Sequence, residues 1–363
     1  MSEKITARDT GIRGKALCQF FDRSVLLYRL GKIYLVNPAD GQKMRKITLP
    51  IEKWKRVASL FRLPERLAHV EVRWAYPIGG YWAFVFYGNH LWRINAETGE
   101  YYQEEVELKG KPLSFAEIKE ISGFENSYVI GDYWGNPRRE AVHIHQKCIG
   151  DRKWHIAFTF PPGTVRHIHG IVPDKQHGCV YILTGDEDAE SGIWIARNNF
   201  AEVKALYVGK QSYRACQLFL YDEDIFYLTD APSEENHLYC ICGEKIVQKE
   251  LLRGSCIYGL VRENGGFFST TCEPDAHAHS KFRYWLTNKP GAGVKDASID
   301  VFGVLGGQIC NIKSFSHDRL PLRLFQYAAA TFANSVCDEV YFTPECVKKY
   351  DQHVFKIEVT KDL

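Results

Sequence analysis

A pattern of two strands and a glycine-closed turn occurs twice near the start of the chain. Residues 30–37, Leu-Gly-Lys-Ile-Tyr-Leu-Val-Asn, recur in altered form at residues 87–95, Tyr-Gly-Asn-His-Leu-Trp-Arg-Ile-Asn. Each copy follows an apolar strand, at residues 24–30 and 81–87. The offset of about 57 residues is within the range of repeat folds built from small antiparallel sheets. Because one such sheet cannot bury both of its faces alone, the repeat favours a fold of stacked sheets.

The rest of the chain consists mainly of short apolar runs separated by turn residues, as expected for strands. These runs form further units at residues 117–160, 167–207, 215–252, 258–310 and 327–359. We therefore predict an all-β chain, a β-propeller of about seven four-stranded blades, as a single domain over residues 1–363. Six or eight blades fit the same spacing.

One segment has a different period. Apolar residues at positions 51, 54, 57, 60 and 61 have helical spacing, and Pro64 follows them. This spacing predicts one short helical insertion near residues 52–63. We expect its basic side chains, between Lys53 and Arg66, to face water.

The amino-acid composition limits the kinds of partner that the protein can bind and the compartment in which we expect it. The chain has 46 Lys and Arg residues against 44 Asp and Glu residues, which gives no electrostatic argument for nucleic-acid binding. It contains no apolar run long enough to span a membrane, and its first residues lack the apolar region of a secretory signal peptide. The eleven cysteines are an odd number and are spread along strand-like segments, which is typical of free thiols. Together these features predict a cytoplasmic protein.

Carboxylates stand at the ends of apolar strands in the second half of the chain, namely Asp186, Asp230 and Glu273. In a propeller, strand ends and loops on one face surround the place where ligands collect. Glycoside hydrolysis uses two carboxylates that flank the scissile bond. The three acids are therefore catalytic candidates, and the alternative is that they tie blades together.

The segment His167-Ile-His169 places two imidazoles on one side of a strand, because residues two apart face the same way. His277 and His279 have the same spacing. Pairs of imidazoles from neighbouring blades suit a divalent first-row metal ion. The predicted ligands are His167, His169, His277 and His279, and His167 is also a candidate for proton transfer. The alternative is that these histidines bond to backbone groups without a metal. No motif for another cofactor is present.

Gln211 and Arg214 lie three residues apart beside Tyr213. An amide and a guanidinium at this spacing suit contact with a sugar carboxylate, and Tyr213 or Tyr258 would provide an aromatic surface for sugar stacking. The alternative for Arg214 is an ion pair between blades, with Asp230 or Asp186. We expect most of the polar candidates to converge on one funnel.

The same stretches resemble a known family. The sequence is similar to the sialidase-like propeller proteins. These proteins are often labelled glycosyl hydrolases and are often found with polysaccharide genes, and they are similar to Asp-box proteins. The matching segments are Asn136-Pro-Arg-Arg, Val142-His-Ile-His, Trp154, His167-Ile-His, Thr184-Gly-Asp, residues 209–214, Thr229-Asp230 and residues 269–273. Turns related to the Asp-box turn occur in altered form at residues 145–154 and 196–206.

The resemblance implies a carbohydrate-active enzyme that cleaves a glycosidic bond in an anionic glycan or oligosaccharide, as a hydrolase or a lyase. Propeller-type pectate-fragment lyases also hold a metal with a His-x-His pair, which is the spacing of His167 and His169. The alternative is a non-catalytic propeller that binds glycan or serves as a scaffold in polysaccharide assembly.

Overall fold

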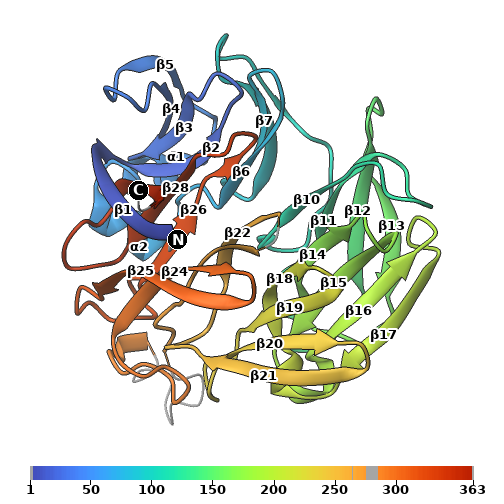
Figure 1. Cartoon of the computed structure of the whole chain (residues 1–363). Coiled ribbons are helices and arrows are strands. Elements are labelled where there is room, and N and C mark those ends of the chain that lie inside the picture. Colours follow the sequence, from blue (N-terminus) through green and yellow to red (C-terminus); the bar gives the residue numbers. More distant parts are fainter. Residues whose placement is uncertain (1–2, 264, 275–284, 362–363) are drawn as a thin grey trace. The chain divides into compact units, whose positions relative to one another are not determined.

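The described residues form seven β-sheets, and these confirm the predicted fold class, a seven-bladed β-propeller (Figure 1). The computed structural model describes residues 3–263, 265–274 and 285–361 of the 363-residue chain. The chain groups into two compact units. We call residues 1–104 with 253–363 the terminal unit, and residues 105–252 the middle unit.

Four of the sheets belong to the terminal unit. The first contains β2 (Lys15–Gln19), β3 (Val25–Arg29), β4 (Lys32–Val36) and β5 (Lys43–Ile47), with β27 (Asn334–Ser335) paired in parallel to β2. The second contains β6 (Trp74–Gly79), β7 (Trp82–Tyr87), β8 (His90–Asn95) and β9 (Tyr101–Gln103). The third contains β22 (Tyr258–Arg262), β23 (Gly265–Ser269), β24 (Ser298–Leu305) and β25 (Gln308–Ser316). The fourth joins the two ends of the chain, because β1 (Glu3–Arg13) pairs with β29 (His353–Lys361), followed by β28 (Val340–Glu345) and β26 (Ala329–Phe332).

The middle unit holds the other three sheets, each with its strands paired in chain order. They are β10 (Phe115–Ile118), β11 (Ser127–Gly131), β12 (Val142–Cys148) and β13 (His155–Phe160); β14 (His167–Asp174), β15 (Cys179–Gly185), β16 (Gly192–Arg197) and β17 (Glu202–Val208); and β18 (Ala215–Tyr221), β19 (Asp224–Thr229), β20 (His237–Cys242) and β21 (Lys245–Leu251). Two single 3₁₀ turns, η1 (Asp188–Glu190) and η2 (Gln211–Tyr213), lie between strands.

Burial within each sheet follows the sequence. The second strand is a continuous apolar run and is buried on both faces, as in β15, where every residue from Cys179 to Gly185 is buried. The last strand is polar and exposed, as in β5, where only Ile47 is buried. Within each unit, neighbouring sheets contact one another through their first strands, as β14 does with β10 and β18, and the last strands are left to solvent.

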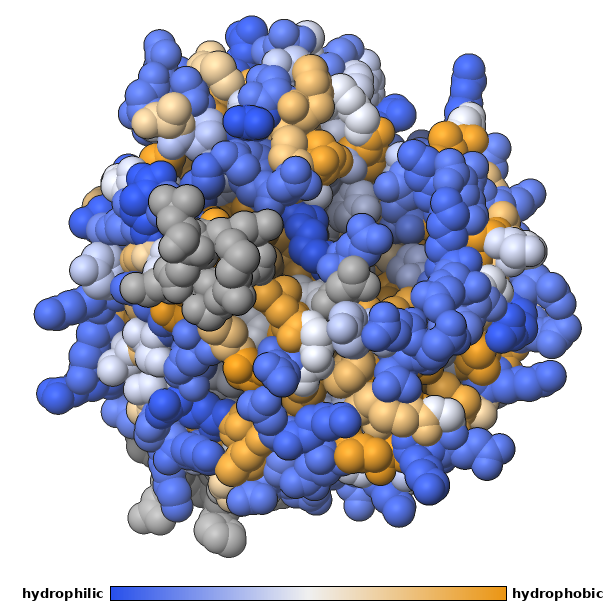
Figure 2. Space-filling model, in the orientation of Figure 1, coloured by the Kyte–Doolittle hydropathy of each residue, from blue (hydrophilic) through white to orange (hydrophobic). Residues whose placement is uncertain are grey.

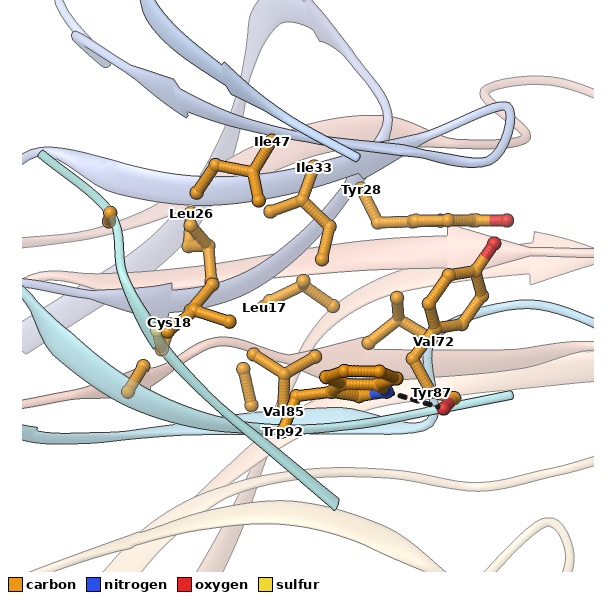
Figure 3. Packing of buried hydrophobic residues seen from close by; sticks show 14 of the residues in the cluster. Leu17, Cys18, Leu26, Tyr28, Ile33, Ile47, Val72, Val85, Tyr87 and Trp92 are labelled. Atoms are coloured by element: carbon orange, nitrogen blue, oxygen red, sulfur yellow. Dashed lines mark hydrogen bonds between the residues drawn. The ribbon is translucent and has the colours of Figure 1, made fainter. Parts of the chain in front are cut away.

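The core of the first two sheets is shown in Figure 3. Leu17, Leu26 and Val85 belong to this core together with Trp92, whose Nε1 donates a hydrogen bond to the carbonyl of Tyr87 at 3.1 Å. Close packing of buried aliphatic and aromatic side chains of this kind provides most of the stabilisation of each blade.

The predicted helix near residues 52–63 is in fact two helices. α1 (Lys53–Ala58) ends at Ala58, with Ser59 as its C-cap, and α2 (Arg62–Ala68) begins four residues after Ala58. Pro64, which we expected to follow the insertion, lies in the first turn of α2. A proline is tolerated there because the backbone N–H groups of a first turn have no partner within the helix.

The expectation that the basic side chains of this insertion face water is wrong for three of them. Lys55 and Arg66 are buried and Arg62 is half-buried. Arg62 forms an ion pair with Asp351 at 2.9 Å, and Arg66 pairs with Asp318. These carboxylates compensate the buried charges, so the helices turn charged side chains inward.

The surface is mostly hydrophilic in the view of Figure 2, with hydrophobic residues in scattered patches. In the part of the chain that the structure describes, no helix has the length and apolar character needed to cross a membrane.

Truncation of a core side chain should destabilise the protein in proportion to the cavity it leaves. Leu26 is fully buried, so we expect Leu26→Ala to lower the free energy of unfolding by about 2 to 5 kcal/mol. Val336→Ala, at a side chain that is 60% exposed, should change it by less than about 0.5 kcal/mol. Chemical denaturation followed by circular dichroism measures both values, and equal effects would contradict the assigned core.

Candidate functional site

An aspartate directly follows the second strand of each sheet in the middle unit. Asp132 follows β11, Asp186 follows β15 and Asp230 follows β19. Because neighbouring strands are antiparallel, the end of a second strand lies beside the start of the first strand of the same sheet. Each aspartate is therefore placed beside the start of the first strand of its sheet. This recurring position is a signal in the sequence, and our sequence analysis did not use it to select Asp132.

The start of β14 carries the two predicted imidazoles, and both are buried. The Nδ1 atom of His167 lies 2.8 Å from the carbonyl oxygen of Trp134, and Nδ1 of His169 lies 3.2 Å from that of Ala215. A carbonyl oxygen can only accept a hydrogen bond, so each Nδ1 carries the hydrogen and donates it. When the rings are neutral, both Nε2 atoms therefore carry a lone pair.

The two Nε2 atoms face each other and the same carboxylate. They are 3.0 Å apart, and Oδ1 of Asp186 lies 3.2 Å from Nε2 of His167 and 3.3 Å from Nε2 of His169. At most one of the nitrogens can carry a hydrogen at this separation. Three acceptors thus converge on one point, which requires a positive occupant: a proton shared between them, or a metal ion.

Glycine before the aspartate makes room for this arrangement. A Cβ atom on Gly185 would lie 2.6 Å from Cε1 of His169 and 3.1 Å from Cγ of Arg214. The Gly-Asp step is therefore needed for the imidazole to lie against the end of β15.

The loop that carries Asp186 is shaped by the buried side chain of Glu190. Oε1 of Glu190 accepts hydrogen bonds from the backbone N–H groups of Asp186 and Glu187 at 3.2 and 3.1 Å, and Oε2 accepts one from Arg139 at 2.7 Å. This part of the acidic loop is consequently fixed, which is the condition for placing Asp186 precisely enough to act as a ligand.

Arg214 holds the loop from the next sheet. Its Nη1 donates to the carbonyl of Asp186 at 3.0 Å, and its Nη2 lies 3.1 Å from Asp186 Oδ1 and 3.5 Å from Asp230 Oδ2. Gln211 donates to the same carbonyl at 2.8 Å. The ion pairs set as the alternative for Arg214 are therefore present, and both residues position the loop.

The protonation states follow from burial and contacts. Burial lowers the pKa of His169, more than the carboxylate of Asp186 raises it, which favours the neutral ring. Burial alone would raise the pKa of Asp186, but a hydrogen bond from the proton shared with Nε2 of His167 and His169 and the charge of Arg214 hold it well below the ordinary range. Asp186 is thus an ionised acceptor.

Ion pairs link the carboxylates of this region to three guanidinium groups. Arg139 pairs with Glu190, Arg166 with Asp186, Glu187 and Glu190, and Arg214 with Asp186 and Asp230. Four carboxylates therefore share three guanidiniums in this network. The described network has one negative charge in excess, which also favours a cation.

Two other groups could hold a metal among the described residues. His169, Cys216 and Asp230 form one, in which Sγ of Cys216 lies 3.3 Å from Asp230 Oδ2. Asp224, Cys240 and Cys242 form the other. Burial raises the pKa of Cys240 to about 12, so this thiol is protonated at neutral pH and is a poor ligand in that form.

The remaining predicted residues take no part in the contacts described above. The ring of Tyr213 contacts that of Tyr207 at 5.6 Å between centroids. Tyr258 begins β22, and Glu273 follows β23, both in the terminal unit. His277 and His279 lie outside the described residues. Six of the polar candidates thus form one network in the middle unit: His167, His169, Asp186, Gln211, Arg214 and Asp230.

The comparisons with known proteins bear on the fold alone. No family model and no curated protein matches the sequence. Among solved structures, the chain is similar to the AfRom2 CNH domain, with 7% identity and a TM-score of 0.54 over 100% of both chains. It is also similar to the β-propeller domain of Cps50 (Swd1) from Myceliophteria thermophila, with 8% identity, a TM-score of 0.54 and 99% and 100% of the two chains covered. A chain of the mitotic checkpoint complex matches with 10% identity, a TM-score of 0.53 and coverage of 98% and 95%.

Loss of the Asp186 charge should destabilise the folded protein, because buried side chains contact this carboxylate. Asp186→Asn leaves the buried guanidinium of Arg214 without the charged oxygen at 3.1 Å, and we expect the free energy of unfolding to fall by about 1 to 3 kcal/mol. The matched control is Asp188→Asn in the same loop, where the side chain is exposed and the effect should be below about 0.5 kcal/mol. Denaturant titration of both variants in chelator-containing buffer checks this. Similar stabilities for the two variants would show that the network is not formed.

Proposed function

We propose that this propeller is a metal-dependent carbohydrate-active enzyme that binds an anionic glycan at the middle-unit cluster and cleaves it by elimination. The observation that supports this proposal is the convergence of His167 Nε2, His169 Nε2 and Asp186 Oδ1 on one point. The cofactor in the proposal is a divalent first-row ion held by these three atoms.

The separations of the three atoms support a transition-metal ion. Bonds of about 2.1 Å at angles between octahedral and tetrahedral values place neighbouring ligand atoms about 3.0 to 3.4 Å apart. The three separations here are 3.0, 3.2 and 3.3 Å. Two imidazole nitrogens and one carboxylate oxygen also favour zinc, cobalt, iron or manganese over calcium, which prefers oxygen ligands.

The hydrogen bonds behind the ligands fit the same assignment. Metal-bound histidines usually donate their other ring N–H to a carbonyl or carboxylate, which fixes the ring and its tautomer. The carbonyls of Trp134 and Ala215 do this for His167 and His169. Arg214 contacts the same Asp186 oxygen at 3.1 Å, and a carboxylate oxygen has lone pairs for both a guanidinium and a metal ion.

The charge of the cluster bears on the substrate. A network with excess carboxylates repels an anionic sugar unless a cation lies between them, so a metal ion would let a uronate carboxylate bind beside Asp186. Arg166, whose side chain is partly exposed, adds a second positive group at the same place.

Asp186 is a metal ligand in this proposal and is not suited to be the general acid of a glycoside hydrolase. Glycoside hydrolysis needs a carboxylic acid whose pKa is raised so that it can protonate the leaving oxygen, whereas the pKa of Asp186 is lowered. In elimination, a base takes the C5 proton of a uronate, the electron pair of the C5–H bond forms a C4–C5 double bond, and the glycosidic oxygen leaves C4 and takes up a proton from water. A cation at the uronate carboxylate stabilises the charge that develops in this reaction.

Metal binding is tested by calorimetry on protein stripped with chelator and then dialysed. We expect one equivalent of Zn²⁺ or Co²⁺ to bind, and His169→Gln and Asp186→Asn to weaken binding at least about tenfold. The matched control is His143→Gln. His143 and His145 have the same spacing as His167 and His169, and Nδ1 of His143 contacts Oγ1 of Thr159 at 2.9 Å. Cys216→Ser tests the overlapping group around Asp230 and should leave binding unchanged. Unchanged binding in Asp186→Asn together with loss in Cys216→Ser would move the site to that group.

Turnover is tested with oligomers of galacturonate, mannuronate and glucuronate in the presence of the bound metal. We expect near-ultraviolet absorbance from an unsaturated uronate, lost on chelation and restored by metal. New reducing ends without that absorbance would indicate a hydrolase. Glycan binding without products would support the non-catalytic scaffold instead, and neither binding nor products would exclude these uronates as substrates.

A further inference from the structure

We propose that the two-helix insertion docks the protein onto an anionic lipid surface. The insertion carries six large apolar side chains that are exposed, and we call them the helical apolar surface: Trp54, Val57, Leu60, Phe61, Leu63 and Leu67. Trp54 is 58% exposed, Val57 65% and Phe61 69%. The six residues belong to α1, to α2 and to the short link between them, so they are close together in the chain. This inference does not depend on the metal site, which lies in the other unit.

The insertion has the reverse of the usual distribution of a surface helix. A helix on a soluble protein normally buries its apolar stripe and exposes its charged face. Here Glu65 is completely buried, where it accepts a hydrogen bond from the hydroxyl of Tyr28 at 2.5 Å, and Arg66 is 3% exposed. Such an arrangement leaves the apolar side chains in water in the isolated chain, and an apolar patch that stays exposed marks an interaction surface.

The inward charges are held by specific partners and do not result from loose packing. Arg62 pairs with Asp351 at 2.9 Å and with Glu65 at 3.3 Å. Arg66 also donates from Nε to the carbonyl of Phe325 at 2.7 Å. These contacts fix α2 in its orientation, so a simple rotation that hid Leu63 and Leu67 would break ion pairs and leave buried charges uncompensated.

The charges that remain at the helical apolar surface are positive. Lys53 and Arg56 are exposed on α1, and neither forms an ion pair with any residue that the structure describes. The neighbouring acid, Glu52, is engaged with Lys55 at 2.6 Å. The outward face of α1 thus combines Trp54 and Val57 with two unpaired cations.

An anionic bilayer matches this combination better than a second copy of the chain. In a two-fold dimer built on the helical apolar surface, Lys53 and Arg56 of both copies would meet at one interface, where like charges oppose association. Anionic lipid headgroups attract the same cations, while tryptophan, phenylalanine and leucine enter the boundary between headgroups and acyl chains. The apolar side chains would then contact the acyl region of the bilayer, and the two cations would contact its anionic headgroups.

Co-sedimentation of the full chain with lipid vesicles tests the proposal. Vesicles of phosphatidylcholine alone are compared with vesicles that also contain phosphatidylserine. We expect binding to the mixed vesicles, weaker binding to phosphatidylcholine, and a decrease in binding as salt is raised. The double variant Trp54→Ser/Phe61→Ser and the double variant Lys53→Gln/Arg56→Gln should each weaken binding to mixed vesicles at least about tenfold.

A matched pair of variants controls for general changes in surface hydrophobicity. Val57→Ser should weaken binding, whereas Val336→Ser, at a side chain exposed to a similar extent outside the helices, should not. Circular dichroism and the unfolding midpoint confirm that each variant is folded. These side chains are exposed, so none of the substitutions removes a core contact.

Four results would overturn the proposal. The first is failure of the wild-type chain to bind mixed vesicles, and the second is equal binding by the Trp54→Ser/Phe61→Ser variant. The third is a concentration-dependent dimer, measured by light scattering, that this variant abolishes while vesicles remain unbound; the surface would then be a contact between copies. Binding of the wild-type chain to acidic apolar peptides but not to vesicles would likewise replace the lipid with a protein partner.

Discussion

The hydrogen bonds from the imidazoles of His167 and His169 to two backbone carbonyls govern the chemistry of the middle-unit cluster. Each bond fixes which ring nitrogen carries the hydrogen, and so turns both Nε2 lone pairs toward Asp186. The carbonyls belong to Trp134, in the loop between β11 and β12 of the preceding sheet, and to Ala215, which begins β18 of the following sheet. Propeller packing places these neighbouring backbones against β14, and the tautomers follow from that packing. A change that moved either sheet would alter the protonation of the site without touching a ligand.

The two regions analysed in detail handle charge in different ways. In the middle unit, four carboxylates and three guanidiniums surround the point where the imidazoles converge, and the excess negative charge favours a cation. In the terminal unit, Arg62 and Arg66 are compensated by carboxylates beneath the helices, while Lys53 and Arg56 stay unpaired at the surface. The first distribution suits a bound ion and an anionic ligand, and the second suits an anionic surface.

Sequence reasoning predicted the sheets more completely than the site. The seven units could be counted because each second strand is an apolar run bounded by turn residues, as in β15. The insertion was predicted as one helix, since spacing alone does not show that α1 ends at Ala58. Its inward charges depend on Asp318 and Asp351, which are far away in the chain. Strand-end positions pointed to Asp186, Arg214 and Asp230. The tethering carbonyls could not be predicted, because backbone acceptors have no signature in the sequence, and neither could the role of Gln211, which holds a loop carbonyl. Asp132 and the role of Gly185 could have been inferred from the recurring Gly-Asp step.

The most direct test of the metal site is a crystal structure of the protein soaked with Zn²⁺ or Co²⁺, with anomalous diffraction recorded above and below the absorption edge of the metal. The tethered tautomers predict one strong anomalous peak about 2.0 to 2.2 Å from Nε2 of His167, Nε2 of His169 and Oδ1 of Asp186, with both Nδ1 atoms still bonded to their carbonyls. A peak beside Cys216 and Asp230, a peak between Cys240 and Cys242 alone, or no peak at full soaking would contradict it.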